Sequence, residues 1–142
     1  MSLIDELKKD EGLRLRAYQD HLGVWTIGYG TNLQVLEIDE ELAERWLVEK
    51  VEDLTESLEN ILFEREILPR FDIDDNRRNA LISMMYQMGV AGTLRFKKMW
   101  AAIEEQDWET AAKEMRDSSW WRDPATRGRA ERMAVRMETG EW

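Results

Sequence analysis

Two carboxylates and one hydroxyl lie close together near the start of the chain. Glu11 and Asp20 are separated by one short alternating segment, and Thr26 follows in the next such segment. Two carboxyl groups in unlike environments can hydrolyse a glycosidic bond, because one delivers a proton to the leaving oxygen while the other stays ionised near the developing positive charge. A nearby hydroxyl can position a water. This chemistry requires no metal ion or other cofactor. The alternative is a structural role, in which Arg14 or Arg16 forms a salt bridge with Glu11.

The first element that must position these residues is a helix over residues 2–11. Ser2 is a suitable N-cap, and Gly12 can end the helix because it adopts the left-handed conformation without a steric penalty. The apolar spacing of Leu3, Ile4 and Leu7 continues onto Glu11. We therefore expect Glu11 on the buried side of this helix, where desolvation favours its neutral, protonated form.

The pattern then changes to the alternation that is typical of strands. The segments "LRLRAYQD" and "VWTIGYG" predict a hairpin with Asp20 at its tip and Thr26 in the returning strand. Gly28 and Gly30 are poor strand residues unless another group approaches their backbone closely. A third short strand is expected around residues 34–38.

The rest of the chain predicts helices. A long one over residues 39–62 carries a regular apolar seam, and at ~36 Å it can either connect two lobes or be a plain bundle helix. Asp74 or Asp75 caps a further helix, and others are expected over residues 93–106, 107–117 and 127–139. The fold class is therefore α+β and mostly helical, with a small antiparallel β-lobe.

Composition narrows the class of protein. The net charge is −10, and residues 37–66 carry twelve acids against three bases. This segment is either a solvated helix surface or an acidic surface that binds a partner. No region is basic enough to favour nucleic acid. Cysteine is absent, which excludes disulfides and thiol chemistry. The sequence shows neither an apolar leader nor a stretch long enough to span a membrane, so we expect no stable membrane association.

Four ordered segments resemble the phage-type lysozymes, the family of the T-even phage endolysins. The segments are "DEGLRLRAYQD" with "WTIGYGT", "RRNALISMMYQMG", "DWETAAKEMRDSSWW" and "RGRAERMAVRMETGEW". Together they cover essentially the whole chain. The resemblance implies one lysozyme domain over residues 1–142. Within it, a β-lobe (12–38) is joined by the long helix (39–62) to a helical lobe (63–142), on which helix 2–11 packs.

The resemblance also implies roles for individual residues. Glu11 takes the place of the general acid, Asp20 that of the second carboxylate and Thr26 that of the hydroxyl that positions water. Positions that contact the sugar chain in the family correspond to Asn32, Tyr86 and Gln87, for which turn capping and core packing are the structural alternatives. Trp120 and Arg129 also match family positions, and we expect a core role for Trp120 and a structural ion pair for Arg129.

The activity that this resemblance implies is cleavage of the β-1,4 bond between N-acetylmuramic acid and N-acetylglucosamine in peptidoglycan. Inversion at the anomeric carbon is expected, with carboxyl groups about 6.5–9.5 Å apart. The expected protein is a monomeric endolysin, made in the bacterial cytoplasm and released through a pore that another protein forms. The alternatives are a non-catalytic wall-binding or virion structural domain, a helical interaction protein using its acidic surface, and a transglycosylase.

The chain also departs from the family pattern. Thr31 stands where the family usually has a histidine, so one structural ion pair is expected to be missing. About twenty residues after Asn32 are absent, which predicts a trimmed β-lobe. Met99 and Glu114 occupy two further cleft positions of the larger relatives. Many phage lysozymes are basic, so an acidic one is expected to bind walls more weakly or to have a different salt optimum.

Overall fold

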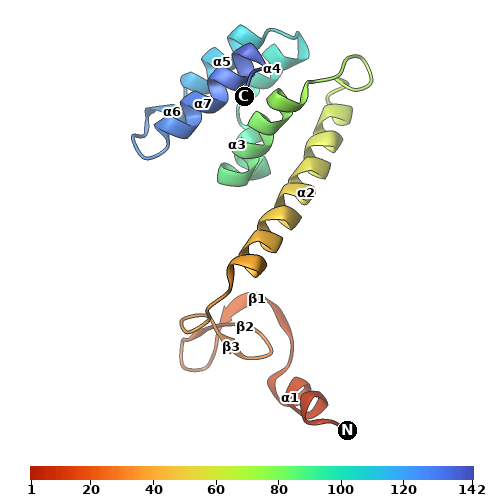
Figure 1. Ribbon diagram of the computed structural model, residues 1–142, viewed down its shortest axis with the longest axis vertical. Helices are drawn as coiled ribbons and strands as arrows, with labels where there is room; N and C mark the ends of the chain where they lie inside the picture. The colour runs from red at the N-terminus through yellow and green to blue at the C-terminus, as the bar shows by residue number, and fades with distance from the viewer. The chain divides into compact units, whose positions relative to one another are not determined.

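The computed structural model describes residues 1–142 and divides into two compact units, residues 1–44 and 45–142 (Figure 1). The boundary lies near the beginning of α2 (Glu40–Glu64). Seven helices and one small antiparallel sheet make up the chain, and 62% of it is helical. The predicted α+β class is confirmed. None of the helices has both the length and the apolar character that crossing a membrane requires.

The first unit begins with α1 (Leu3–Glu11), which is capped as the sequence predicts. The Asp5 amide donates to Ser2 Oγ at 3.2 Å, and the Ser2 amide donates back to Asp5 Oδ2 at 3.1 Å. Such a capping box satisfies donors that a helix otherwise leaves free at its N-terminus. Gly12 ends the helix with φ +71°, so Glu11 is its last residue.

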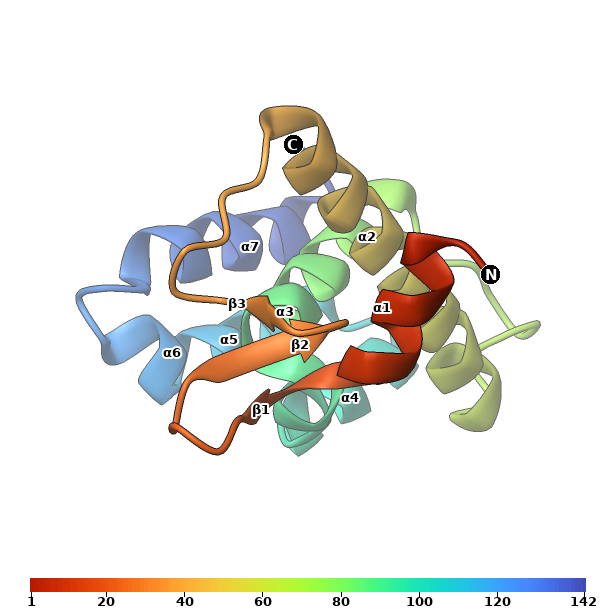
Figure 2. The ribbon, with the colours of Figure 1, turned by 90° about the horizontal axis from the view of Figure 1, so that it is seen from below.

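Three antiparallel strands follow in the order β1 (Arg14–Gln19), β2 (Trp25–Gly28) and β3 (Thr31–Asn32), and Figure 2 shows β2 between the other two. The hairpin is confirmed, but the expected third strand over residues 34–38 is wrong. Gly28 and Gly30 have φ of +69° and +75°, which turns the chain back at once so that Thr31 pairs with Ile27. Asn32 Oδ1 then accepts from the Gln34 amide at 2.9 Å, and the chain leaves the sheet.

The second unit contains most of α2 and five further helices. Their bounds are α3 (Asp75–Leu94), α4 (Lys97–Glu104), α5 (Trp108–Arg116), α6 (Ser119–Arg122) and α7 (Arg127–Thr139). α7 packs against α3, α5 and α6 (Figure 1). The helices expected over 107–117 and 127–139 are confirmed, with Asp107 and Gly140 as caps.

The expected helix over residues 93–106 is wrong at its start. α3 continues to Leu94, and the chain breaks before α4 because the Thr93 carbonyl accepts from the Phe96 amide and from Trp100 Nε1. α3 itself is kinked at Gly89, which has φ +81°. The kink directly follows Gln87 and Met88, two residues that matter for the candidate site.

The apolar core lies entirely in the second unit. Leu54, Leu58 and Ile61 of the predicted α2 seam are buried in it, whereas Leu47 and Val51 are exposed. Trp100 is the largest fully buried side chain. The first unit has a single buried residue, Thr26, which is 4% exposed and lies on the central strand of the sheet. The one well-buried side chain of this unit is thus a candidate functional residue.

Candidate functional site

Glu11 lies at the C-terminal end of α1, with its carboxylate against the turn between β2 and β3. A Cβ built on Gly30 would be 2.6 Å from Glu11 Oε2 and 3.1 Å from Glu11 Cδ, so the carboxyl group fills the space of the missing side chain. The close approach that Gly30 predicts is therefore present.

Within the first unit nothing buries Glu11, and the expected packing of α1 on the helical lobe stays a prediction. Glu11 is exposed, as are Leu3, Ile4 and Leu7 of the apolar stripe. The physical reason is that the small sheet of residues 1–44 supplies no core against which α1 can bury this stripe. Neither Arg14 nor Arg16 forms a salt bridge with Glu11, and Arg14 lies over the Tyr18 ring at 5.0 Å from its centroid instead. The structural alternative considered for Glu11 is thus not realised.

Asp20 lies in the loop between β1 and β2, as the sequence predicts. Its Oδ1 accepts from the Leu22 amide at 2.8 Å and from the Val24 amide at 2.9 Å. Hydrogen bonds to the charged form lower a carboxyl pKa. The Val24 amide accordingly holds the pKa of Asp20 below its usual 3.8, with smaller contributions from Leu22 and His21. The loop therefore keeps Asp20 ionised while Oδ2 has no partner within the protein.

Thr26 is fixed by the same residue as Asp20. Its Oγ1 donates to the Val24 carbonyl at 2.9 Å, and the Asp20 amide donates to this carbonyl at 3.0 Å. The backbone of Val24 thus holds one carboxylate through its N–H and one hydroxyl through its C=O. Because the hydroxyl hydrogen of Thr26 is used in this bond, its oxygen can only accept from a further group.

Asn32 lies directly across from Thr26 in the sheet, and Tyr18 lies across from Thr26 on the other side. Residues paired across antiparallel strands present their side chains on the same face. The register therefore forms a row of three polar side chains, Tyr18–Thr26–Asn32. Asn32 Oδ1 is bonded to Gln34, as the turn-capping alternative requires, which leaves its NH₂ group free.

The other two candidate residues, Tyr86 and Gln87, lie on α3 in the second unit. Tyr86 is 44% exposed, so the core-packing alternative for it is wrong. Gln87 Oε1 accepts from Trp120 Nε1 at 2.9 Å, and Trp120 also meets Phe96 edge-on, with ring centroids 6.4 Å apart. Trp120 is buried as expected and fixes the Gln87 amide.

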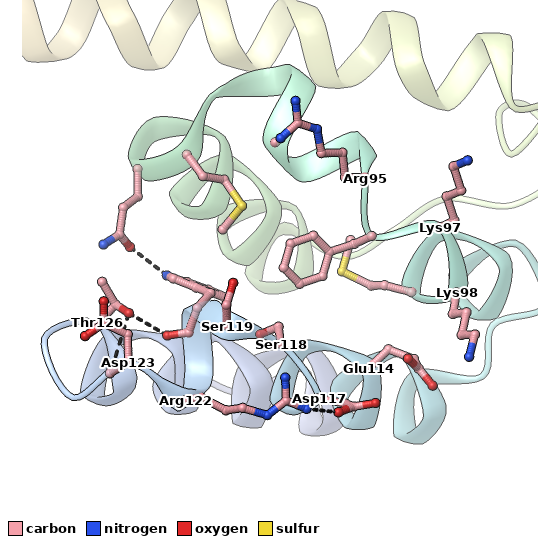
Figure 3. Close-up of a pocket in the computed structure, with 16 residues that line it drawn as sticks. Arg95, Lys97, Lys98, Glu114, Asp117, Ser118, Ser119, Arg122, Asp123 and Thr126 are labelled. Carbon is pink, nitrogen blue, oxygen red and sulfur yellow. Dashed lines mark hydrogen bonds and ion pairs between the residues drawn. The ribbon is translucent and has the colours of Figure 1, made fainter.

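A pocket of about 1000 Å³ opens beside Gln87 and Trp120 within the second unit (Figure 3). Its apolar lining residues include Met88, Phe96 and Met99. Arg95, Lys97 and Lys98 line one side of it, and Glu114 and Asp117 line the other, where Asp117 pairs with Arg122. Met99 and Glu114, which occupy two cleft positions of the larger relatives, both line this pocket.

The expected ion pair of Arg129 is wrong. Its guanidinium donates to Ser83 instead, from Nε to Oγ at 3.2 Å and from Nη2 to the carbonyl oxygen at 3.0 Å. No group of His, Asp and Glu side chains is arranged to bind a metal ion. The role of Val24 could not be predicted from the sequence, because Val24 holds Asp20 and Thr26 through its backbone N–H and C=O groups and not through its side chain.

Comparisons with known protein families and proteins identify relatives of this chain. Residues 8–134 match the family model described as phage lysozyme. The chain is 32% identical to "Probable T4-type lysozyme 1" of Dictyostelium discoideum, over 98% of this chain and 95% of that protein. It is also 32% identical to the "Pre-baseplate central spike protein Gp5" of Enterobacteria phage T4, of which it spans only 28%.

A third relative is the "Endolysin" of Acyrthosiphon pisum secondary endosymbiont phage 1, which is 33% identical over 59% of this chain and 55% of that protein. The first two alignments extend over 163 positions, more than the 142 residues of this chain. These relatives thus contain residues with no counterpart in this chain. The family model matches most of the chain, and the first relative is similar over nearly the whole length of both proteins. The chain therefore belongs to the phage lysozyme family.

Proposed function

We propose that this protein is a muramidase that hydrolyses the β-1,4 bond between N-acetylmuramic acid and N-acetylglucosamine in peptidoglycan. The observation that carries the proposal is the arrangement around Val24. Its backbone holds an ionised Asp20 and an acceptor-only Thr26 in the same compact unit as Glu11. A glycoside hydrolase of this kind needs two carboxyl groups in unlike roles, and membership of the phage lysozyme family supports the same reading.

In this mechanism Glu11 is the general acid. It gives its proton to the glycosidic oxygen as the bond from that oxygen to the anomeric carbon breaks. A water held by Thr26 forms the new bond to the anomeric carbon, and its proton passes to Asp20. The hydrogen bonds that lower the pKa of Asp20 keep its carboxylate ionised before the water attacks.

We further propose that the reaction inverts the anomeric configuration, since a water between Thr26 and Asp20 would attack opposite the leaving group. Nuclear magnetic resonance of the first product, before mutarotation, tests this. An α-anomer supports inversion and a β-anomer contradicts it. A 1,6-anhydro end would show that the protein is a transglycosylase.

Asn32, Tyr86 and Gln87 are proposed to bind the sugar chain. The exposed Tyr86 ring offers an apolar surface, and the free NH₂ groups of Asn32 and Gln87 are donors for sugar hydroxyls. The proposed biological role is that of a phage or prophage endolysin, acting as a monomer. It would reach the wall through a membrane pore that another protein forms.

The experiment that tests the function is Glu11→Gln, assayed by the clearing of purified peptidoglycan and by product analysis. Loss of cleavage with unchanged thermal unfolding is expected. Glu6→Gln is the matched control, because Glu6 lies on the same helix and its side chain forms no hydrogen bond or ion pair. Full activity of the Glu11 variant would contradict the assignment.

A second candidate function is a structural or wall-binding domain without catalysis. The similarity to the central spike protein Gp5 supports this second candidate, since this chain matches a 28% portion of that longer protein. This alternative predicts that the wild-type chain binds peptidoglycan without releasing reducing ends. Release of reducing ends that depends on Glu11 excludes it.

A further inference from the structure

The polar row Tyr18–Thr26–Asn32 contains one residue to which neither the family resemblance nor the comparisons assign a role. Tyr18 is the partner of Thr26 on β1, and its hydroxyl makes no hydrogen bond within the protein. The side chain is half-buried, with Arg14 over its ring at 5.0 Å from the centroid. An unpaired phenol beside the candidate site therefore remains to be explained.

The hydrogen-bond balance at Thr26 shows what is missing for a bound water. Thr26 has given its hydrogen to the Val24 carbonyl, so a water there must donate to Thr26 Oγ1. Asp20 is ionised and accepts only, so the second hydrogen of the water points to its free oxygen. Both hydrogens of the water are then used, and its two lone pairs remain. A hydrogen-bond donor to one lone pair would fix the orientation of the water and leave the other lone pair to attack the anomeric carbon.

Two free donors flank Thr26, and they are not equivalent. β1 ends at Gln19, and Asp20 continues its pairing with the next strand by donating its amide hydrogen to the Val24 carbonyl, so the alternation places the side chains of Tyr18 and Asp20 on the same face. Asn32 lies on β3, on the opposite side of Thr26 from β1. The donor next to both Thr26 and Asp20 is therefore Tyr18.

We propose that the Tyr18 hydroxyl donates a hydrogen bond to the attacking water, which Thr26 and Asp20 hold through its two hydrogens. The bond forms between the water oxygen and the anomeric carbon, one water proton passes to Asp20, and Tyr18 keeps its own proton. Arg14 restrains the ring through its cation–π contact. This assignment rests on the proposed hydrolysis.

The test compares Tyr18→Phe, which removes only the hydroxyl, with Tyr18→Leu, which also removes the ring. Kinetics are measured on soluble peptidoglycan fragments together with thermal unfolding. Tyr18→Phe is expected to lower kcat about tenfold with KM and stability unchanged, because one hydrogen bond to the reacting water is lost. Tyr29→Phe is the matched control, since Tyr29 is exposed in the same unit, has Lys8 over its ring and does not pair with Thr26.

The outcomes separate this inference from the proposed function. Wild-type kcat in Tyr18→Phe overturns the inference and leaves the hydrolase assignment intact, and a loss only in Tyr18→Leu assigns the effect to the ring and also overturns it. A rise in KM with unchanged kcat contradicts a role in orienting water. Full activity of Glu11→Gln, measured in parallel, overturns the proposed function and this inference with it.

Discussion

The carboxylate of Glu11 occupies the place where a side chain at Gly30 would be. Only 2.6 Å separates Glu11 Oε2 from a Cβ built on Gly30, a distance that real Cβ contacts do not reach. Two remote parts of the first unit, the end of α1 and the turn between β2 and β3, therefore meet at the proposed acid. The missing side chain of Gly30 is what allows this contact.

Gly30→Ala should displace the Glu11 carboxyl and lower kcat by about a hundredfold, the cost expected when a catalytic group moves by about 1 Å. The backbone at residue 30 has φ +75°, so alanine also destabilises the fold by about 1–2 kcal/mol. Kinetics on soluble fragments and thermal unfolding measure the two effects separately.

Gly28→Ala is the matched control for this change. Gly28 has φ +69° and nothing within 4 Å of its built Cβ, so alanine brings the same backbone strain without touching Glu11. It should lose similar stability and keep most of its activity. Equal loss of activity in both variants would show that strain alone, and not the contact with Glu11, controls catalysis.

Asp20→Asn should keep the loop and lose the reaction. The asparagine oxygen can still accept from the Leu22 and Val24 amides, whereas Asp20→Ala removes both bonds and should unfold at lower temperature. Both variants lack the base that takes a proton from water. Thermal unfolding reports the effect of the loop hydrogen bonds, and peptidoglycan cleavage reports the effect of the lost charge.

The same residue predicts a pH dependence. The pKa of Asp20 is lowered in the folded protein, so its ionised form stabilises the fold; this contribution is complete above pH 3.8 and is lost as the pH falls through the lower folded value. The stability difference between wild type and Asp20→Asn should therefore vanish at acid pH. A difference that stays constant below pH 3.8 would contradict this.

Much of the fold could be predicted because its long elements have both caps and periodic apolar positions. The helix over residues 127–139 is the clearest case, with Gly140 directly after it. β3 has two residues, too few for any alternation to be visible, so the sequence placed the third strand too late. The apolar stripe of α1 is exposed within the first unit, since a helical stripe predicts a buried side but not which element covers it.

Part of the candidate site could also be predicted from the sequence. Gly30 could be singled out because glycine is unusual in a strand, and the structure places Glu11 against it. Val24 could not, because it acts through its N–H and C=O groups, which every residue except proline possesses. The sequence therefore indicates the candidate side chains but not the backbone groups that fix Asp20 and Thr26.

Trp120→Phe should weaken substrate binding through Gln87. The phenyl ring can keep the edge-on contact with Phe96, but it cannot donate to Gln87 Oε1, so the amide is free to rotate. KM is expected to rise several-fold with kcat nearly unchanged, and Gln87→Ala should add little in the double variant because the two residues act as one unit.

The neighbouring tryptophan provides the control for this prediction. Trp121 Nε1 donates to Glu131 Oε2 at 2.8 Å, so Trp121→Phe removes the same kind of bond to a different acceptor. It should lower stability to a similar degree and leave KM unchanged. Additive effects of Trp120→Phe and Gln87→Ala would show that Trp120 does not act through this amide.

The acidic surface of α2 should make the clearing of whole walls depend on salt. With a net charge of −10, much of it contributed by residues 37–66, the protein is repelled by an anionic wall at low ionic strength. Screening becomes effective near 0.1 M salt, where the Debye length is about 10 Å. Clearing should therefore rise with salt up to this range, while cleavage of soluble fragments changes little.

Replacing Glu49, Glu52 and Glu56 by glutamine should remove part of this salt dependence, because all three are exposed and form no ion pair. Replacing the same residues by aspartate keeps the charge and serves as the control. If the glutamine variant instead loses all clearing activity while its cleavage of soluble fragments is normal, the acidic surface binds a partner that the wall assay requires. A rate that falls steadily with salt in the wild type would show that charge repulsion does not limit access to the wall.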